Sequence, residues 1–278
     1  MTQARELSLI AADGTPLFVA DWPAAAPGAG ADKSIVLMHG IGEHCGRYEH
    51  VARFFNDCGY AVRAYDHRGH GRSGGRRGDV PDTGTLVQDA KIVIDDFAAK
   101  LSAPPLLLGH SMGGLFAAYY ATLALSPLRG LILSAPALTL KLSGSQQLLL
   151  RILGAIAPGL GVPNGLKSRY LSRRDEVVTA YDNDPLVHAK ISARLLRAML
   201  AAIEYTQAHA SALRIKTLLL LGGDDRLVDA SGSAAFFRKL APGIGSMSTY
   251  PGFYHEIFNE AEASRVFDDM RAWLGELR

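Results

Sequence analysis

The sequence predicts an α/β protein with a mostly parallel central sheet, flanked by helices and capped by an inserted helical segment. Short apolar runs that are typical of buried parallel strands alternate with longer stretches of helical composition. This alternation stops once, from residue 136 to residue 210, where helical patterns with Pro and Gly follow one another. We therefore expect a core formed by residues 1–135 and 211–278, and a helical cap or lid formed by residues 136–210.

The composition is that of a globular protein. The chain has 278 residues, of which 48% are hydrophobic and 20% charged, enough for a sizeable core. A net charge of +2 gives no reason to expect nucleic acid as a partner. No apolar run approaches the roughly 18 residues of a membrane span, and the N-terminus lacks the pattern of a secretory signal. These features favour a cytoplasmic protein; the oligomeric state is not predicted.

The elements of the core follow from the same patterns. Two alternating stretches around Asp13-Gly14 predict a hairpin over residues 5–22, followed by a loop over 23–32. We expect strands at 33–38, 60–66, 106–108, 128–135, 215–221 and 246–250, and helices at 47–57, 83–100, 115–125, 230–240 and 262–275.

The centre of the prediction is the motif Gly109-His110-Ser111-Met112-Gly113, a G-x-S-x-G between a buried strand and an apolar helix. In that context the motif forms a sharp turn that exposes the serine hydroxyl, and small residues are needed two positions away on either side. We interpret Ser111 as a catalytic nucleophile. The alternative is an ordinary strand-to-helix turn with an incidental serine.

A serine nucleophile needs a base that is oriented by an acid, and on this fold the acid precedes the histidine. The best acid lies in the loop directly after a buried strand, where Asp225 is the first choice and Asp224 the second; Asp229 is expected to start or cap the next helix. His255 is the only histidine after Asp225, so it is the expected base. His110 should point elsewhere, and an acidic loop without catalytic function is the alternative for the aspartates.

The oxyanion of a tetrahedral intermediate needs backbone donors. The motif supplies the N–H of Met112, and the loop His39-Gly40-Ile41-Gly42 supplies a second, which we assign to Ile41. A phosphate-binding loop is the alternative, but the characteristic lysine and glycine spacing are missing. No metal-ligand spacing and no cofactor motif is present, so we expect neither a metal nor a cofactor.

Two other features have ordinary interpretations. The segment Asp66–Gly74 is basic and rich in glycine, which we interpret as a loop with paired or solvated arginines in preference to a nucleic-acid patch. Cys45 and Cys58 are too few for a disulfide framework, so we expect free thiols.

Several stretches together resemble the family of monoacylglycerol lipases and related bacterial lysophospholipase-like α/β-hydrolases. They include HGIGEHCGRYEH from residue 39, DHRGHGRSGG from 66, GHSMGG from 109, LSRRDEVVTAYDNDPLVH from 171, GGDDRLVD from 222 and YPGFYHEIFNE from 250. The resemblance implies an α/β-hydrolase fold, the triad Ser111, Asp225 and His255, and oxyanion donors at Ile41 and Met112. It also implies that Glu43 and Arg47 bind the polar end of the substrate.

The chain departs from this family at three positions. Cys45 and Val228 stand where relatives often have serine and cysteine, and Phe258 replaces a histidine that contacts the glycerol group in some members. These departures concern preference for the head group.

The cap contains the apolar stretch 137–163, with helical character at Gln146–Ile156 and only Lys141 and Arg151 charged. Packing on the core explains part of this pattern. A cap that is apolar on more than one face also suggests an acyl tunnel, or a surface for peripheral contact with a membrane.

The sequence therefore predicts a serine hydrolase that cleaves single-chain lipid esters, foremost monoacylglycerol to glycerol and fatty acid, through an acyl-enzyme. A lysophospholipase or general carboxylesterase is the alternative within the same class. A non-catalytic ligand receptor on the same fold is the alternative from a different class.

Overall fold

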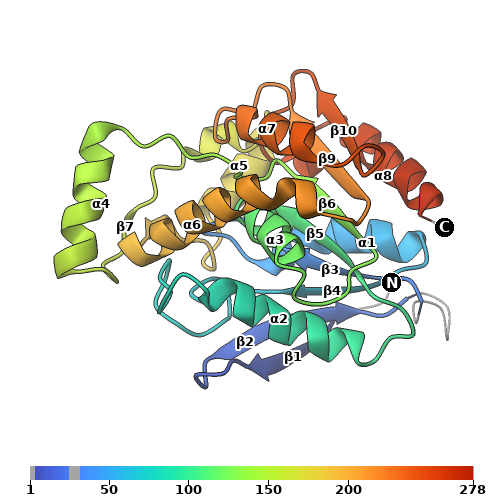
Figure 1. The fold of residues 1–278 in the computed structure, drawn as a ribbon, viewed down its shortest axis with the longest axis horizontal. Helices are drawn as coiled ribbons and strands as arrows, with labels where there is room; N and C mark the ends of the chain where they lie inside the picture. The colour runs from blue at the N-terminus through green and yellow to red at the C-terminus, as the bar shows by residue number, and fades with distance from the viewer. Residues whose placement is uncertain (1–3, 25–31, 278) are drawn as a thin grey trace.

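The computed structural model describes residues 4–24 and 32–277, so positions 25–31 of the predicted loop lie outside the described residues. An eight-stranded sheet in the order β1-β2-β4-β3-β5-β6-β9-β10 forms its centre (Figure 1). Strand β2 pairs antiparallel with β1 and β4, and all other neighbours in this sheet pair parallel. The strands are β1 (Arg5–Ile10), β2 (Pro16–Trp22), β3 (Ser34–Met38), β4 (Ala61–Tyr65), β5 (Leu106–His110), β6 (Gly130–Ser134), β9 (Thr217–Gly222) and β10 (Gly245–Tyr250).

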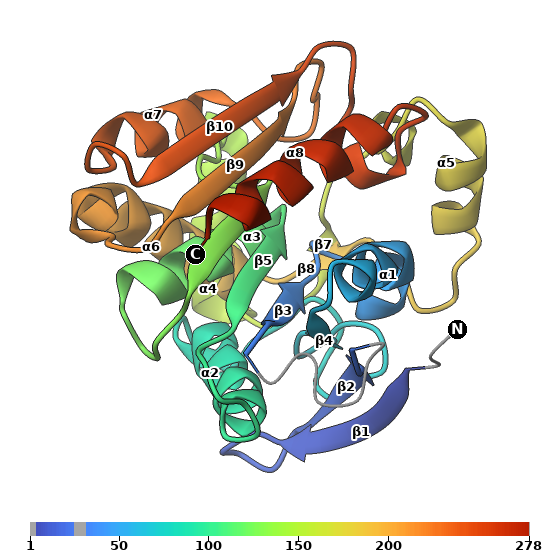
Figure 2. The same cartoon turned by 90° about the vertical axis from the view of Figure 1, so that its right-hand side faces the viewer.

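Both faces of the sheet are covered, as the continuous apolar strands predict. In β3, Val36 and Met38 face one hydrophobic cluster, while Ile35 and Leu37 face the other. The first cluster lies under α2 (Thr85–Ala98), α3 (Met112–Thr122), α6 (Ala193–His209) and α7 (Ser231–Lys239). The second lies under α1 (Glu49–Asp57) and α8 (Ser264–Glu276), on the opposite side of the sheet (Figure 2). The predicted α/β class is confirmed.

The predicted helix at 115–125 starts three residues earlier than expected. Ser111 itself is the N-cap of α3, so the helix begins at Met112 and ends at Thr122. Gly113 and Gly114 weaken the helical pattern of the first turn, which explains the late start in the prediction. Helix α1 also differs, because a short 3₁₀ turn at Cys45–Tyr48 replaces its expected first residues.

Residues 136–210 run between β6 and β9. They contain α4 (Gly144–Ile156), a small antiparallel pair of β7 (Val162–Pro163) with β8 (Lys190–Ile191), α5 (Asp175–Asp182) and α6. Helix α6 packs on α3, whereas α4 stands out from the body of the molecule and contacts α6 (Figure 1). Its first turn is fixed by a capping box between Ser143 and Gln146. The division into a core and a cap stays a prediction.

The basic loop after β4 is tied down by acids. Arg68 donates to Asp89 and to Asp13, and Arg72 pairs with Glu6. Both cysteines are free thiols, as expected. Within 4–24 and 32–277, no helix has the length and apolar character needed to span a bilayer.

Candidate active site

Ser111 occupies a strained turn between β5 and α3. Its φ of 55° and ψ of −118° lie in a region that residues with side chains rarely adopt. A Cβ at Gly109 would collide with the carbonyl of Gly113, and a Cβ at Gly113 would collide with the carbonyls at the end of β3. The two glycines therefore let the turn close against the neighbouring strand, as expected from the need for small residues on either side of the serine.

Asp225 and His255 form a hydrogen-bonded pair. Asp225 follows β9, His255 follows β10, and His255 Nδ1 lies 2.7 Å from Asp225 Oδ2. The other carboxylate oxygen accepts the N–H groups of Leu227 and Val228 at 2.8 and 3.0 Å. Because one oxygen is fixed by the backbone, the second is held in place to orient the imidazole.

Burial and pairing act in opposite directions on these two groups. Burial alone lowers the pKa of His255, but the Asp225 carboxylate outweighs it and leaves the pKa above its ordinary value. Burial alone raises the pKa of Asp225, and its bonds with His255 and the backbone bring it below the ordinary value. The pair is thus built to stabilise a proton on the imidazole.

The two other aspartates of this loop have different surroundings. Asp224 is exposed, and its N–H donates to the Phe253 carbonyl. Asp229 pairs with Lys141 and accepts the N–H of Ser231, so it lies at the start of α7 as expected, although Ala230 is the N-cap of that helix. Of the three aspartates considered from the sequence, the structure brings only Asp225 to His255.

Ser111 and His255 both line a cavity of about 460 Å³, together with Ile41 and Met112. This volume is within the range of small-molecule sites, about 300–1,000 Å³. No hydrogen bond joins the Ser111 hydroxyl to His255, although both residues are described. Such catalytic bonds are often long in free enzymes and tighten when substrate binds.

The loop after β3 is curled toward Ser111 by contacts on both sides. The Gly40 N–H donates to Glu43 Oε1 at 2.6 Å. Gly42 has a φ of +78°, and its carbonyl accepts the His188 N–H from residues 136–210 at 2.8 Å. Met112 is the first residue of α3, where no preceding helical turn supplies an acceptor for its N–H. The Ile41 and Met112 amides therefore belong to segments that border Ser111.

The walls of the large cavity are mostly apolar and come from α4, α6 and the segments between them. The apolar contributors include Leu140, Leu149, Leu150, Leu153, Val162, Ile191, Leu196, Met199 and Val228. The charged side chains among its described lining residues are Lys141, Lys167 and Arg226, and these lining residues include no Asp or Glu. The cavity thus suits an uncharged chain with a polar or anionic end.

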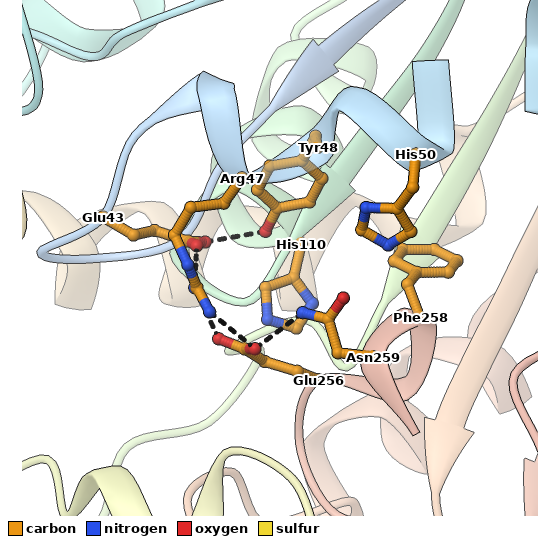
Figure 3. Close-up of a pocket in the computed structure, with 8 residues that line it drawn as sticks. All are labelled: Glu43, Arg47, Tyr48, His50, His110, Glu256, Phe258 and Asn259. Atoms are coloured by element: carbon orange, nitrogen blue, oxygen red, sulfur yellow. Dashed lines mark hydrogen bonds and ion pairs between the residues drawn. The ribbon is translucent and has the colours of Figure 1, made fainter. Parts of the chain in front are cut away.

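Glu43 and Arg47 lie elsewhere. They line a second, much smaller cavity together with Tyr48, His110 and Glu256, and they are absent from the lining of the large one (Figure 3). Arg47 donates to Glu43 Oε2 at 2.5 Å and to both oxygens of Glu256. The structure therefore places them beside the triad as an ion-pair cluster, and their contact with substrate stays a prediction.

Two residues have contacts beside the predicted triad that the sequence did not reveal. The His110 ring lies with its centroid 4.7 Å from that of His255, and its Nδ1 is 3.0 Å from Ser134 Oγ. His110 does not line the large cavity, in keeping with the expectation that it points elsewhere, but its ring packs on that of His255. Glu256 follows His255 directly, and only this adjacency in the sequence could have drawn attention to it.

Two of the three positions at which the chain differs from its family line a cavity. Phe258 lines the small cavity and Val228 the large one, whereas Cys45 is buried and its N–H donates to Asp66. Phe258 thus contributes an aromatic wall beside the ion-pair cluster.

Known proteins resemble the chain over most of its length. A family model described as serine aminopeptidase, S33, matches residues 29–262. A monoacylglycerol lipase of Mycolicibacterium smegmatis is 38% identical over 244 residues, which cover 86% of this chain and 87% of that protein. The phospholipase YtpA of Bacillus subtilis is 35% identical over 243 residues, covering 86% and 93%. The crystal structure of Paleococcus ferrophilus monoacylglycerol lipase is 33% identical, with a TM-score of 0.84 over 94% of this chain and 99% of that one.

Proposed function

We infer the substrate from the family and the activity of the chain. It belongs to the serine aminopeptidase S33 family of α/β-hydrolases, and it is a carboxylic ester hydrolase. We propose that it cleaves monoacylglycerols to glycerol and fatty acid. The observation that carries this proposal is the cavity of about 460 Å³, apolar along α4 and α6, with Ser111 and His255 at its base. Burying each CH₂ of an acyl chain there contributes about 0.8 kcal/mol to binding.

In this mechanism the Ser111 hydroxyl attacks the ester carbonyl while His255 accepts its proton. Asp225, fixed by two backbone N–H groups, holds the imidazole and stabilises its positive charge. The N–H groups of Ile41 and Met112 bind the oxyanion. His255 then protonates the leaving alcohol, and water attacks the acyl-enzyme by the same steps to release the fatty acid.

A second candidate is hydrolysis of lysophospholipids. Lys167 and Arg226 line the large cavity, and neither pairs with a carboxylate within 4–24 and 32–277. A phosphate group on the polar end of the substrate would meet these two cations. The similarity to a protein called phospholipase YtpA agrees with this candidate.

The peptidase activity in the family description fits the site less well. An aminopeptidase must bind the free α-ammonium group of its substrate, which requires a carboxylate or similar acceptor. The lining residues of the large cavity include no Asp or Glu. Its charged side chains are cationic and would repel such a group.

Hydrolysis by the wild type and by Ser111→Ala tests the proposal. The panel contains monoacylglycerols of several chain lengths, lysophosphatidylcholine, and an aminoacyl p-nitroanilide. We expect Ser111→Ala to lose at least about a thousandfold in kcat and to lose labelling by a fluorophosphonate, while the exposed Ser264→Ala keeps both. Activity in Ser111→Ala would refute the nucleophile; faster turnover of lysophosphatidylcholine would favour the second candidate.

We further propose that α4 contacts a lipid surface. No residue of α4 is buried, and Leu148, Ile152 and Ile156 are 58%, 47% and 76% exposed at a spacing of four residues. Leu149, Leu150 and Leu153 lie on the adjoining side of the helix and line the cavity, and Leu149 is also 48% exposed. Helix α4 would thus lie between the lipid surface that contains the substrate and the cavity that binds it.

A further inference from the structure

Arg47 is held between two carboxylates that come from distant parts of the chain. Its Nη1 donates to Glu43 Oε2 at 2.5 Å and to Glu256 Oε1 at 2.6 Å, and its Nη2 donates to Glu256 Oε2 at 2.8 Å (Figure 3). Glu43 and Glu256 are both buried, with 3% and 5% of their surfaces exposed. Two parallel hydrogen bonds between a guanidinium and a carboxylate fix the relative orientation of the two groups. Because the pair is buried, removing one partner would leave an uncompensated charge.

Each carboxylate is also bonded to a loop of the active site. Glu43 Oε1 accepts the Gly40 N–H at 2.6 Å, in the loop that carries Ile41. Glu256 follows His255, and its own N–H donates to the Leu171 carbonyl at 2.7 Å. Its Oε2 also accepts Asn259 Nδ2 at 2.7 Å. Arg47 therefore links the oxyanion loop to the histidine loop through side chains.

We propose that Glu256 is a positioning residue for the ester hydrolysis: through Arg47 and Glu43 it fixes the His255 loop relative to the oxyanion loop. The proposal rests on the proposed function, because it assumes that His255 is the base. Glu256 does not touch the large cavity, so it acts on the reaction through His255. The function is to keep the imidazole and the two N–H donors at a constant separation while Ser111 changes its bonds.

The charge of Glu256 gives this arrangement a second effect. His255 is faced by Asp225 on the β9–α7 loop, by His110 on β5, and by Glu43, Arg47 and Glu256 of the cluster. After burial and Asp225, the Glu256 carboxylate is the next contribution, and it raises the pKa of His255. Removing the negative charge of Glu256 leaves the positive charge of Arg47 less compensated and lowers the pKa of His255.

Glu256→Gln and Glu256→Asp separate the two effects. In Glu256→Gln, with a soluble short-chain ester, we expect kcat to fall about tenfold because the base is less well placed, and KM to stay unchanged. The acid limb of kcat/KM should also move to lower pH, because that limb reports the pKa of the free base. Glu256→Asp keeps the charge but is too short for both bonds, so kcat should fall while the acid limb stays in place.

Glu262→Gln is the matched control, because Glu262 lies six residues after Glu256, is exposed, and also pairs with an arginine, Arg173. We expect wild-type kcat and pH profile for it. A wild-type kcat in Glu256→Asp, or an unmoved acid limb in folded Glu256→Gln, would overturn the proposal even if Ser111→Ala is inactive. If Glu256→Gln does not fold, the kcat of Glu256→Asp still tests whether Glu256 positions the His255 loop. Activity in Ser111→Ala would instead refute the proposed function.

Discussion

At the scale of single residues, the proposed catalytic arrangement depends on which carboxylate oxygens of Asp225 already accept hydrogen bonds. Asp225 has one oxygen bonded to two backbone N–H groups and the other to His255. A carboxylate held this way can select the tautomer with a proton on Nδ1, which leaves Nε2 free to accept the serine proton. Asp224, one residue away, is exposed and lacks this arrangement.

The adjacent aspartates allow a prediction with a control beside it. Asp225→Asn keeps the shape of the side chain but favours the wrong tautomer of His255, so kcat should fall by about 10³–10⁴-fold. Asp224→Asn should keep a kcat within about twofold of the wild type, since single surface changes away from a site have small effects. Steady-state hydrolysis of a short-chain ester measures both. Equal losses in the two variants would contradict the assignment of Asp225.

At the scale of elements, α4 has two apolar sides that are expected to do different things. The proposed lipid contact uses Leu148 and Ile152, whereas the cavity uses Leu149, Leu150 and Leu153. We expect the double variant Leu148→Ser/Ile152→Ser to bind phosphatidylcholine vesicles at least about tenfold more weakly, because apolar burial contributes about 1.5–3 kcal/mol per large side chain. Its turnover of a soluble short-chain ester should be unchanged.

A cosedimentation assay with vesicles measures this binding. Ile10→Ser is the control, because Ile10 is 61% exposed on the edge strand β1, far along the sheet from α4. It should bind vesicles like the wild type. If the control weakens binding as much as the double variant, contact through α4 is refuted.

The elements also show what a sequence can and cannot predict. The convergence of Ser111, Asp225 and His255 could be predicted because each follows a strand, and parallel strands bring their ends to one edge of the sheet. The predicted start of α3 was three residues too late because Gly113 and Gly114 weaken the helical pattern of its first turn. The pairing of Glu256 with Arg47 could not be predicted, because 209 positions separate the two and only the folded loops bring them together.

At the scale of the whole molecule, the polar layer under the active site is held in a neutral state. His39, His67, His70 and His110 are all buried. His39 shows how this works, since its Nδ1 contacts the Gly40 carbonyl and its Nε2 accepts the His67 N–H, which defines one neutral tautomer. Burial lowers the pKa of all four, to about 3 for His110.

This layer predicts sensitivity to acid. In the unfolded chain these histidines take up protons below about pH 6.5, but in the folded protein they stay neutral, so the free energy of unfolding falls as the pH falls. Each such group contributes about 1.4 kcal/mol per pH unit well below pH 6.5. His255 has a raised pKa and acts in the opposite direction, but only above about pH 6.5, where the unfolded chain has lost the proton.

Urea unfolding at several pH values between 8 and 5 measures this dependence. His70→Asn removes one neutral histidine, so toward pH 5 the free energy of unfolding should depend on pH less steeply than in the wild type, by up to about 1.4 kcal/mol per unit. The slope is the readout, because the substitution also changes the stability itself. Ser264→Ala, an exposed substitution of a residue that does not titrate in this range, should keep the wild-type slope. A wild-type slope in His70→Asn would mean that His70 is charged in the folded protein, against the burial that the structure shows.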